Sequence, residues 1–302
     1  MGFRRMMIAS IIVIILFGSV IGCSGQKDNS RNLGPQTNSD TQTISTTEET
    51  ALKTPTPTVE PTKTVEPTPI AEPTVDKSYD SIENGPVSIY TIDGQTLFAV
   101  ITLPEAENDR HVALILGHER DSNYHSWDPF IEELTNMGYT IIAFDFRGHG
   151  ESSGSKDFRT LKEDVDSVIG YLNYQGFDLI VCVGASQGGT GCLASTLTTD
   201  SIIGIAMISS PMNIQTRHIL KSYLGNLTIP KLIMVDENDF ANNNTPGFVD
   251  DILRMYEWSA EPKLLYLGPG ILHGASILMG ESGIEARSMF IDFLSTILES
   301  LE

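Results

Sequence analysis

The chain has 302 residues, with 19 Lys+Arg against 39 Asp+Glu, and a formal net charge of −20. Length alone suggests about two domains at ~150 residues each. Residues 81–302 contain 12 basic and 30 acidic residues and so carry −18 of the −20. A charge of this sign argues against nucleic-acid binding, which needs a basic surface, and against electrostatic docking onto anionic lipid.

The first 23 residues have the pattern of an export signal. Arg4 and Arg5 precede an uncharged apolar run from residue 6 to residue 21, shorter than the ~20 apolar residues of a spanning helix. The run ends in Val-Ile-Gly-Cys at residues 20–23. This resembles a bacterial lipobox, in which small residues precede a cysteine that is lipidated and becomes the mature N-terminus. We expect a signal peptide at 1–23, a lipidated Cys23 and an extracytoplasmic protein anchored to the cell membrane. An ordinary signal peptide or an uncleaved anchor is the alternative.

Residues 24–80 have the composition of a linker. They hold 7 of the 15 prolines and 13 threonines, and a segment so poor in large apolar residues cannot offset its ordering entropy by burial. Proline favours extended backbone, which predicts a disordered spacer. A glycosylated Thr-rich stalk is the alternative. One domain at 81–302 then remains, instead of two.

Two cysteines, Cys182 and Cys192, lie in this domain in apolar context. Two are too few for a disulfide framework, and we expect them to be buried free thiols. No CxxC motif or His/Cys cluster predicts a zinc site, and we expect no metal or cofactor.

The domain alternates short apolar runs with longer amphipathic stretches. Asp93-Gly94 lies between the first two runs and is a hairpin signal. The alternation of strands and helices predicts an α/β fold with a mostly parallel, eight-stranded sheet and helices on both faces. The expected strands are 87–92, 97–103, 112–116, 139–144, 179–183, 202–208, 231–235 and 263–267, and the expected helices are 127–137, 161–174, 188–197 and 285–298.

The sharpest motif is Gly184-Ala-Ser186-Gln-Gly188, between an expected strand and an expected helix. A strand that turns directly into a helix puts the middle residue in a strained conformation, and the glycines leave room for the close passage. The turn presents the Ser186 hydroxyl, and the Gln187 N–H can face a developing oxyanion.

With this motif, residues 87–300 resemble the α/β-hydrolase superfamily. Residues 143–152, Ala-Phe-Asp-Phe-Arg-Gly-His-Gly-Glu-Ser, are similar to the family's Asp-x-Arg-Gly-x-Gly-x-Ser loop after the fourth strand. We expect Asp145, Arg147 and His149 to hold this loop by hydrogen bonds, and we do not expect His149 to be a catalytic base.

The resemblance implies the other catalytic residues by their order, since the acid follows the nucleophile and the histidine comes last. Asp239 has the family's usual spacing after the strand at 231–235, with Asp236 as the alternative acid. His273 follows the last strand, and His218 is a weaker candidate. The implied mechanism is acyl transfer with Ser186 as nucleophile, His273 as base and Asp239 orienting the imidazole.

A second oxyanion donor is expected in the loop Gly117-His118-Glu119-Arg120, where the Glu119 N–H matches the family's donor position. Here a histidine and an acid depart from the family's pattern. A carboxylate at this position disfavours anionic substrates unless Arg120 pairs with it.

About 20 residues separate the sixth and seventh strands, which leaves little or no cap domain and an open site. We therefore expect a serine hydrolase that cleaves small acyl esters. A peptidase or thioester hydrolase of the same fold, or a non-catalytic binding lipoprotein, is the alternative. Five residues are expected to line an acyl pocket or to belong to the core: Tyr124, Trp127, Met212, Phe240 and Ile271.

Overall fold

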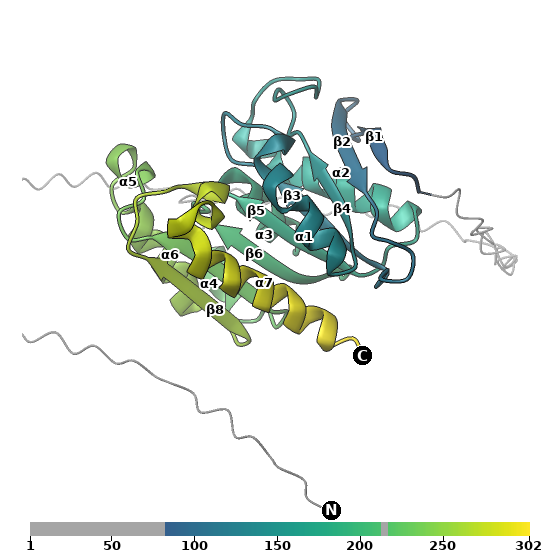
Figure 1. The fold of residues 1–302 in the computed structure, drawn as a ribbon. Coiled ribbons are helices and arrows are strands. Elements are labelled where there is room, and N and C mark those ends of the chain that lie inside the picture. The colour runs from purple at the N-terminus through teal and green to yellow at the C-terminus, as the bar shows by residue number, and fades with distance from the viewer. Residues whose placement is uncertain (1–81, 213–216) are drawn as a thin grey trace, which may run out of the picture. The chain divides into compact units, whose positions relative to one another are not determined.

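The computed structural model describes residues 82–212 and 217–302. The expected signal peptide, Cys23 and the linker at 24–80 lie outside the described residues. Eight strands form one sheet in the order β1-β2-β4-β3-β5-β6-β7-β8 (Figure 1). The strands are β1 (Gly85–Tyr90), β2 (Thr96–Thr102), β3 (Val112–Gly117), β4 (Tyr139–Phe144), β5 (Ile180–Ala185), β6 (Ile202–Ile208), β7 (Lys231–Asp236) and β8 (Lys263–Gly268).

The pairing confirms the predicted sheet. β1 and β2 form an antiparallel hairpin around Asp93-Gly94, β2 pairs antiparallel with β4, and every other neighbouring pair is parallel. Every residue of β3, β4, β5 and β7 is buried. Such continuous apolar runs are typical of parallel strands that helices cover on both faces. The carboxyl ends of these strands therefore meet at one edge of the sheet.

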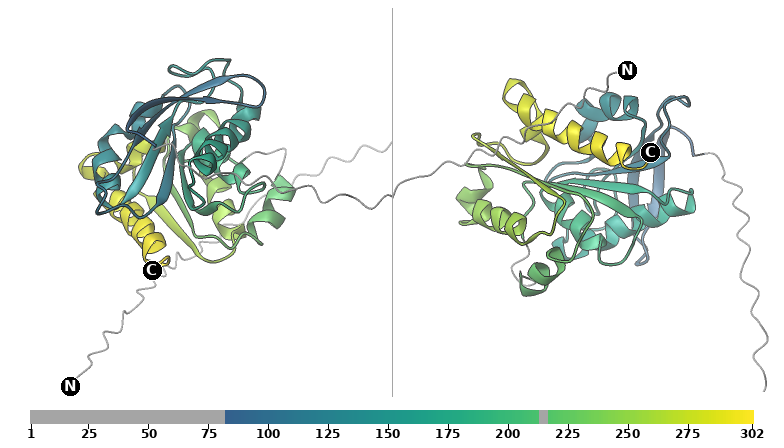
Figure 2. Two further views of the ribbon diagram at one scale, coloured as in Figure 1. Left: turned by 90° about the vertical axis from the view of Figure 1, so that its right-hand side faces the viewer. Right: turned by 90° about the horizontal axis from the view of Figure 1, so that it is seen from below.

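Helices cover both faces of the sheet, as Figure 2 shows in its view from below. Alternation along the strands divides the core in two, so that Cys182 of β5 faces one layer while Val181 and Val183 face the other. The first layer contains α2 (Leu161–Tyr174), α3 (Gln187–Ser195), α4 (Arg217–Leu224) and α6 (Phe248–Trp258). The second contains η1 (Tyr124–Phe130), α1 (Ile131–Asn136), η4 (Gly274–Leu278) and α7 (Ile284–Glu299).

The helix α6 was not among the predicted elements. Its buried residues Phe248, Val249, Ile252 and Met255 have the i, i+1, i+4, i+7 spacing of a helix with one apolar face. That signal was present in the sequence. Between β6 and β7, α4 is the one helix in the described residues, in keeping with the expected lack of a cap domain.

The prediction of two free thiols is wrong, because Cys182 and Cys192 form a disulfide bond. The turn after β5 is so tight that α3 folds back along the strand. Its second turn comes over the middle of β5 and leaves the two Cα atoms 5.6 Å apart, within the range that a disulfide spans. Two cysteines on a strand and the following helix can therefore meet although they are ten positions apart in the chain.

No helix in residues 82–212 and 217–302 is long and apolar enough to span a membrane. Over the same ranges, no group of three or more His, Cys, Asp or Glu side chains is placed to hold a metal ion.

Candidate active site

Ser186 lies in the turn between β5 and α3 with φ 51° and ψ −113°. A non-glycine residue with positive φ is strained, and such strain persists only where the surroundings impose it. The surroundings here are close backbone contacts. A Cβ at Gly184 would lie 2.0 Å from the Gly188 carbonyl carbon, and one at Gly188 would lie 2.3 Å from the Gly117 oxygen. The two glycines of the motif are therefore required by the packing.

Gln187 is the first residue of α3. The first N–H groups of a helix have no partner within the helix, and the helix dipole adds partial positive charge there. The Gln187 N–H therefore lies next to Ser186 as a free hydrogen-bond donor with partial positive charge, which is what stabilises an oxyanion. The Ser186 N–H is not available for this role, because it donates to the Ile208 carbonyl at 2.7 Å.

His273 precedes η4 and bonds to Asp239. Its Nδ1 lies 2.9 Å from both carboxylate oxygens of Asp239. A carboxylate only accepts, so Nδ1 carries the proton and Nε2 is left as an acceptor. The Asp239 side chain is fully buried, and its Oδ1 also accepts from the Ala241 N–H at 2.9 Å. The arrangement holds the ring in one tautomer and one orientation.

Asp236, the alternative acid, has a different role. Its carboxylate accepts from the Leu272 N–H at 2.8 Å and so ties the loop before His273 to the end of β7. Burial raises the pKa of Asp236. The structure thus pairs His273 with Asp239 and not with Asp236. His218 lies in the first turn of α4, and its side chain is outside the described residues.

The His273 loop lies against the Ser186 turn. A Cβ built at Gly274 would be 3.4 Å from the Ala185 Cβ, so the residue after His273 contacts the residue before Ser186. Within the described residues, His273 has its hydrogen bonds with Asp239 and none with Ser186. The structure thus brings Ser186, Asp239 and His273 to one edge of the sheet. No hydrogen bond between Ser186 and His273 is formed there.

The loop after β3 reaches the same edge, because Gly117 pairs with Gly184 in the sheet. His118 is fully buried here and bridges two backbone segments. Its Nε2 accepts from the Phe146 N–H at 3.1 Å, so Nδ1 carries the proton and donates to the Glu119 carbonyl at 2.6 Å. His118 therefore fixes the backbone of Glu119. Nothing in the motif predicted this role.

The Glu119 carboxylate has no cationic partner in the described part of the chain. Its Oε1 accepts from the Ser126 Oγ at 3.1 Å, and its Oε2 is buried without a hydrogen bond. The Arg120 Nε lies instead 3.9 Å from an oxygen of Asp121. The side chain contacts Gly274, since a Cβ there would be 3.4 Å from the Glu119 Cδ. An unpaired negative charge thus lies next to the His273 loop.

The loop after β4 is held as expected. Asp145 is fully buried, and its carboxylate accepts from the N–H groups of Tyr124 and Glu151, both at 2.8 Å. Arg147 donates from Nε to Asp164 at 2.7 Å. His149 contacts the Arg147 carbonyl through Nδ1 at 3.0 Å. All three residues stabilise the loop that closes one side of the site.

The five candidate pocket residues divide between core and surface. Trp127 and Met212 are buried in the core, and Tyr124 is partly buried against it. Phe240 and Ile271 are instead 53% and 64% exposed. The Phe240 ring lies 5.2 Å from the His273 ring and therefore flanks the site. A separate apolar cavity of about 360 Å³ lies between α2, α3 and α4. Because neither Ser186 nor His273 lines it, we do not assign this cavity to the site.

Comparison with known proteins supports the fold. A family profile described as alpha/beta hydrolase fold matches residues 115–250. A predicted CIB-like hydrolase from Thermoplasma acidophilum superposes with a TM-score of 0.57 at 19% identity, covering 72% of this chain and 100% of that one. An esterase from Pyrococcus furiosus gives the same TM-score and identity, covering 72% and 92%. The chain has the α/β-hydrolase fold.

Among curated proteins, epoxide hydrolase B of Mycobacterium tuberculosis is 31% identical to this chain over 122 residues. The match covers 39% of this chain and spans only 33% of the relative's length. The shared segment supports the fold. It is too short to assign the relative's activity to this protein.

We expect His118 to determine part of the pH dependence of the free energy of unfolding. Burial lowers the pKa of His118 to about 4 from an ordinary value of 6.5. The unfolded chain therefore binds the proton first, and the folded state loses stability as the pH falls through this window. We expect wild type to lose about 2 kcal/mol more than His118→Gln between pH 7 and pH 5. Urea unfolding at the two pH values measures this, and parallel losses in both proteins would contradict it.

Proposed function

We propose that the protein is a serine hydrolase that cleaves carboxylic esters through an acyl-enzyme on Ser186. The observation that carries the proposal is the His273–Asp239 hydrogen bond, which lies at the sheet edge where Ser186 is presented. It leaves the His273 Nε2 free to accept a proton. The preferred substrates are small acyl esters, because α4 is the one helix between β6 and β7 in the described residues and is too short to form a cap.

In the proposed reaction, the His273 Nε2 takes the Ser186 proton while Oγ attacks the ester carbonyl. The N–H groups of Gln187 and Glu119 donate to the oxyanion, and His273 then returns the proton to the leaving alcohol. Water cleaves the acyl-enzyme by the same steps. The Ser186–His273 hydrogen bond that is unmade in the structure is of the kind that forms when substrate binds.

Serine chemistry favours an ester over an epoxide for this chain. Attack of the Ser186 hydroxyl on an ester gives an acyl-enzyme, which water can cleave at the carbonyl. Attack on an epoxide would give an ether, which has no carbonyl for water to attack. The proposed substrate class therefore follows the nucleophile, although the curated relative is named an epoxide hydrolase.

The purified full-length chain tests the proposal when incubated with p-nitrophenyl acetate and with a fluorophosphonate probe. We expect hydrolysis of the ester and one probe molecule bound per chain. Peptide mass spectrometry should place the label on Ser186. An unlabelled protein, or a label on another residue, would refute the proposal.

Because the Glu119 carboxylate has no cationic partner in the described residues, we expect the enzyme to prefer neutral esters over anionic ones. At a separation of ~6 Å and an effective dielectric constant of ~20, a like charge costs about 3 kcal/mol, or roughly 100-fold in rate. We expect kcat/KM for p-nitrophenyl butyrate to exceed that for mono-p-nitrophenyl succinate by such a factor. Glu119→Gln should reduce this ratio.

The matched control is Glu257→Gln, an exposed acid near the end of α6 at the opposite edge of the sheet. It should keep the wild-type ratio. The same ratio in Glu119→Gln and wild type would show that the carboxylate does not sense substrate charge.

The same proposal places the domain outside the cytoplasm, held to the membrane by lipid on Cys23. Support comes from the signal-like residues 1–23 and from the disulfide, since disulfides persist mainly in oxidising compartments. The net charge of −20 on the chain would keep the domain from adhering to an anionic lipid surface.

If Cys23 carries the lipid, its substitution should change the location of the protein. Cys23→Ser should release the protein from the membrane fraction or leave an unprocessed precursor, because the lipid acceptor is gone. Fractionation with an immunoblot measures this, and Cys182→Ala serves as a control that keeps Cys23. Unchanged membrane retention and processing in Cys23→Ser would contradict the lipoprotein assignment.

A further inference from the structure

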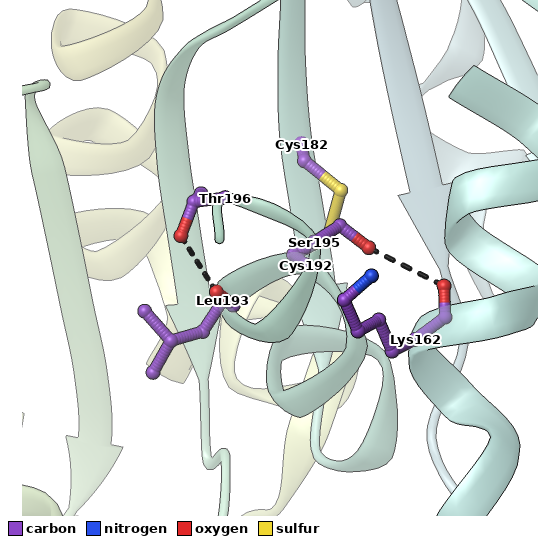
Figure 3. The surroundings of a disulfide bond; sticks show 6 residues. All are labelled: Lys162, Cys182, Cys192, Leu193, Ser195 and Thr196. Atoms are coloured by element: carbon purple, nitrogen blue, oxygen red, sulfur yellow. Dashed lines mark hydrogen bonds between the residues drawn. A yellow bond between two sulfur atoms is a disulfide. The ribbon is translucent and has the colours of Figure 1, made fainter. Parts of the chain in front are cut away.

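The Cys182–Cys192 disulfide joins a strand to a helix (Figure 3). These two elements flank the turn that carries Ser186. Cys182 lies on β5 and Cys192 on α3, so Ser186 lies between them in the chain. The bridge therefore closes a covalent ring around the strained residue. Widening the turn would relieve that strain, and the ring opposes such widening.

The helix on one side of this turn is weak by composition. Three of the first five residues of α3 are glycine, at positions 188, 189 and 191, and glycine lowers helix stability because it has more backbone freedom to lose. A helix that starts with so many glycines does not hold its first turns firmly by its own hydrogen bonds.

These glycines are nevertheless required for packing. A Cβ at Gly188 would lie 2.3 Å from the Gly117 oxygen, and one at Gly189 would lie 2.9 Å from the Gly184 oxygen. A Cβ at Gly191 would lie 2.9 Å from a methyl carbon of Val165. The close approach of α3 to its neighbours excludes better helix formers, so rigidity must come from another source. Cys192 follows directly after these glycines.

We propose that the Cys182–Cys192 disulfide is a positioning device for catalysis, which holds α3 on β5 so that the Ser186 Oγ and the Gln187 N–H keep their mutual orientation. This inference rests on the proposed serine hydrolase function. Small displacements of reacting groups cost large factors in rate. Removal of the bridge should therefore slow acylation in protein that is still folded.

The disulfide stays oxidised in the folded protein and does not act as a redox switch. Both cysteines are fully buried in the core between β5, α2 and α3. Thiol–disulfide exchange needs access of a thiolate to one of the two sulfur atoms. A soluble reductant therefore cannot reach the bond while the domain is folded, and the native enzyme should keep its activity in dithiothreitol.

The experiment compares full-length wild type with a variant that carries Cys182→Val and Cys192→Ala. This pair removes the bridge and keeps the number of side-chain heavy atoms, which limits the cavity. Leu172→Ala is the control for general destabilisation. Leu172 is buried in the same core but lies near the C-terminal end of α2. All proteins are measured at a temperature at which near-ultraviolet circular dichroism shows each to be folded.

In the double variant we expect the fluorophosphonate labelling rate to fall by about 10-fold or more. The kcat for p-nitrophenyl acetate should fall while KM changes by less than about twofold. Amide hydrogen exchange should become faster in residues 184–195 and remain unchanged in β7 and β8. Leu172→Ala should keep the wild-type labelling rate although its unfolding temperature falls.

Labelling of the folded double variant within about twofold of wild type would overturn the inference and leave the bridge a purely stabilising role. Free thiols at both Cys182 and Cys192 in wild type unfolded without reductant would also overturn it. If wild type itself does not react with the probe, the serine hydrolase proposal fails and the positioning role fails with it. A reactive wild type with an equally reactive double variant refutes the positioning role alone.

Discussion

Alanine in place of Ser186 is expected to abolish fluorophosphonate labelling and to lower kcat for p-nitrophenyl acetate by about 10⁴-fold or more. In the proposed mechanism, this hydroxyl forms the acyl-enzyme. Because Ser186 is almost fully buried and its φ of 51° is imposed by the surrounding backbone, the substitution removes one oxygen and little packing. The folded structure should therefore persist, which circular dichroism would show.

His273→Ala should cost a similar factor, and the double variant with Ser186→Ala should lose little more. The non-additivity follows because residues that act as one unit lose their function together. Ser288→Ala, on the exposed side of α7, is the matched control and should retain wild-type turnover. Equal labelling of Ser186→Ala and wild type would show that the probe reacts elsewhere.

Gly184→Ala is expected to have the second large effect, which is a loss of stability of the fold. The new Cβ would lie 2.0 Å from the Gly188 carbonyl carbon and 2.1 Å from the Gly189 nitrogen. Both are backbone atoms, so no side chain can rotate away and α3 must separate from β5. We expect a loss of about 3 kcal/mol or more in the free energy of unfolding, together with loss of ester hydrolysis. Denaturant unfolding and the turnover assay measure the two effects.

Gly170→Ala provides the matched control for this substitution. Gly170 lies within α2 on the exposed surface, and a Cβ there would meet no atom within 4 Å. Alanine should therefore stabilise the protein by about 0.5–1 kcal/mol through its better helix propensity. If Gly184→Ala were as stable as wild type, the close contact of β5 and α3 would be absent from the protein in solution.

Much of the fold was predictable from the sequence because its signals are local. The apolar runs at 112–116 and 139–144 correspond to β3 and β4, which are buried on both faces. The strand–glycine–serine–glycine–helix pattern predicted the strained turn at Ser186. Chain order narrowed the candidate partners to a few residues, and the structure pairs His273 with Asp239. The strands and the turn needed only the periodicity of neighbouring residues. The candidate partners of Ser186 followed from the family resemblance, which implies their order in the chain.

Other features were decided by contacts between distant segments. Asp236 and Asp239 are three positions apart, and only the path of the loop before His273 shows which carboxylate meets the ring. Among residues 82–212 and 217–302, no cation pairs with Glu119, because Arg120 lies beside Asp121 instead. Residue type and spacing alone do not determine these directions.

The disulfide shows the same division most clearly. The sequence by itself determined that a strand and a glycine-rich helix flank Ser186, and it placed one cysteine in each. Only the tertiary structure decided that the helix folds back close enough for the two sulfur atoms to bond. The physical reason is that the helix approaches the strand as far as backbone contacts at Gly184, Gly188 and Gly117 allow. That approach also depends on Gly117 of the neighbouring strand β3, which lies outside the nine residues between the cysteines.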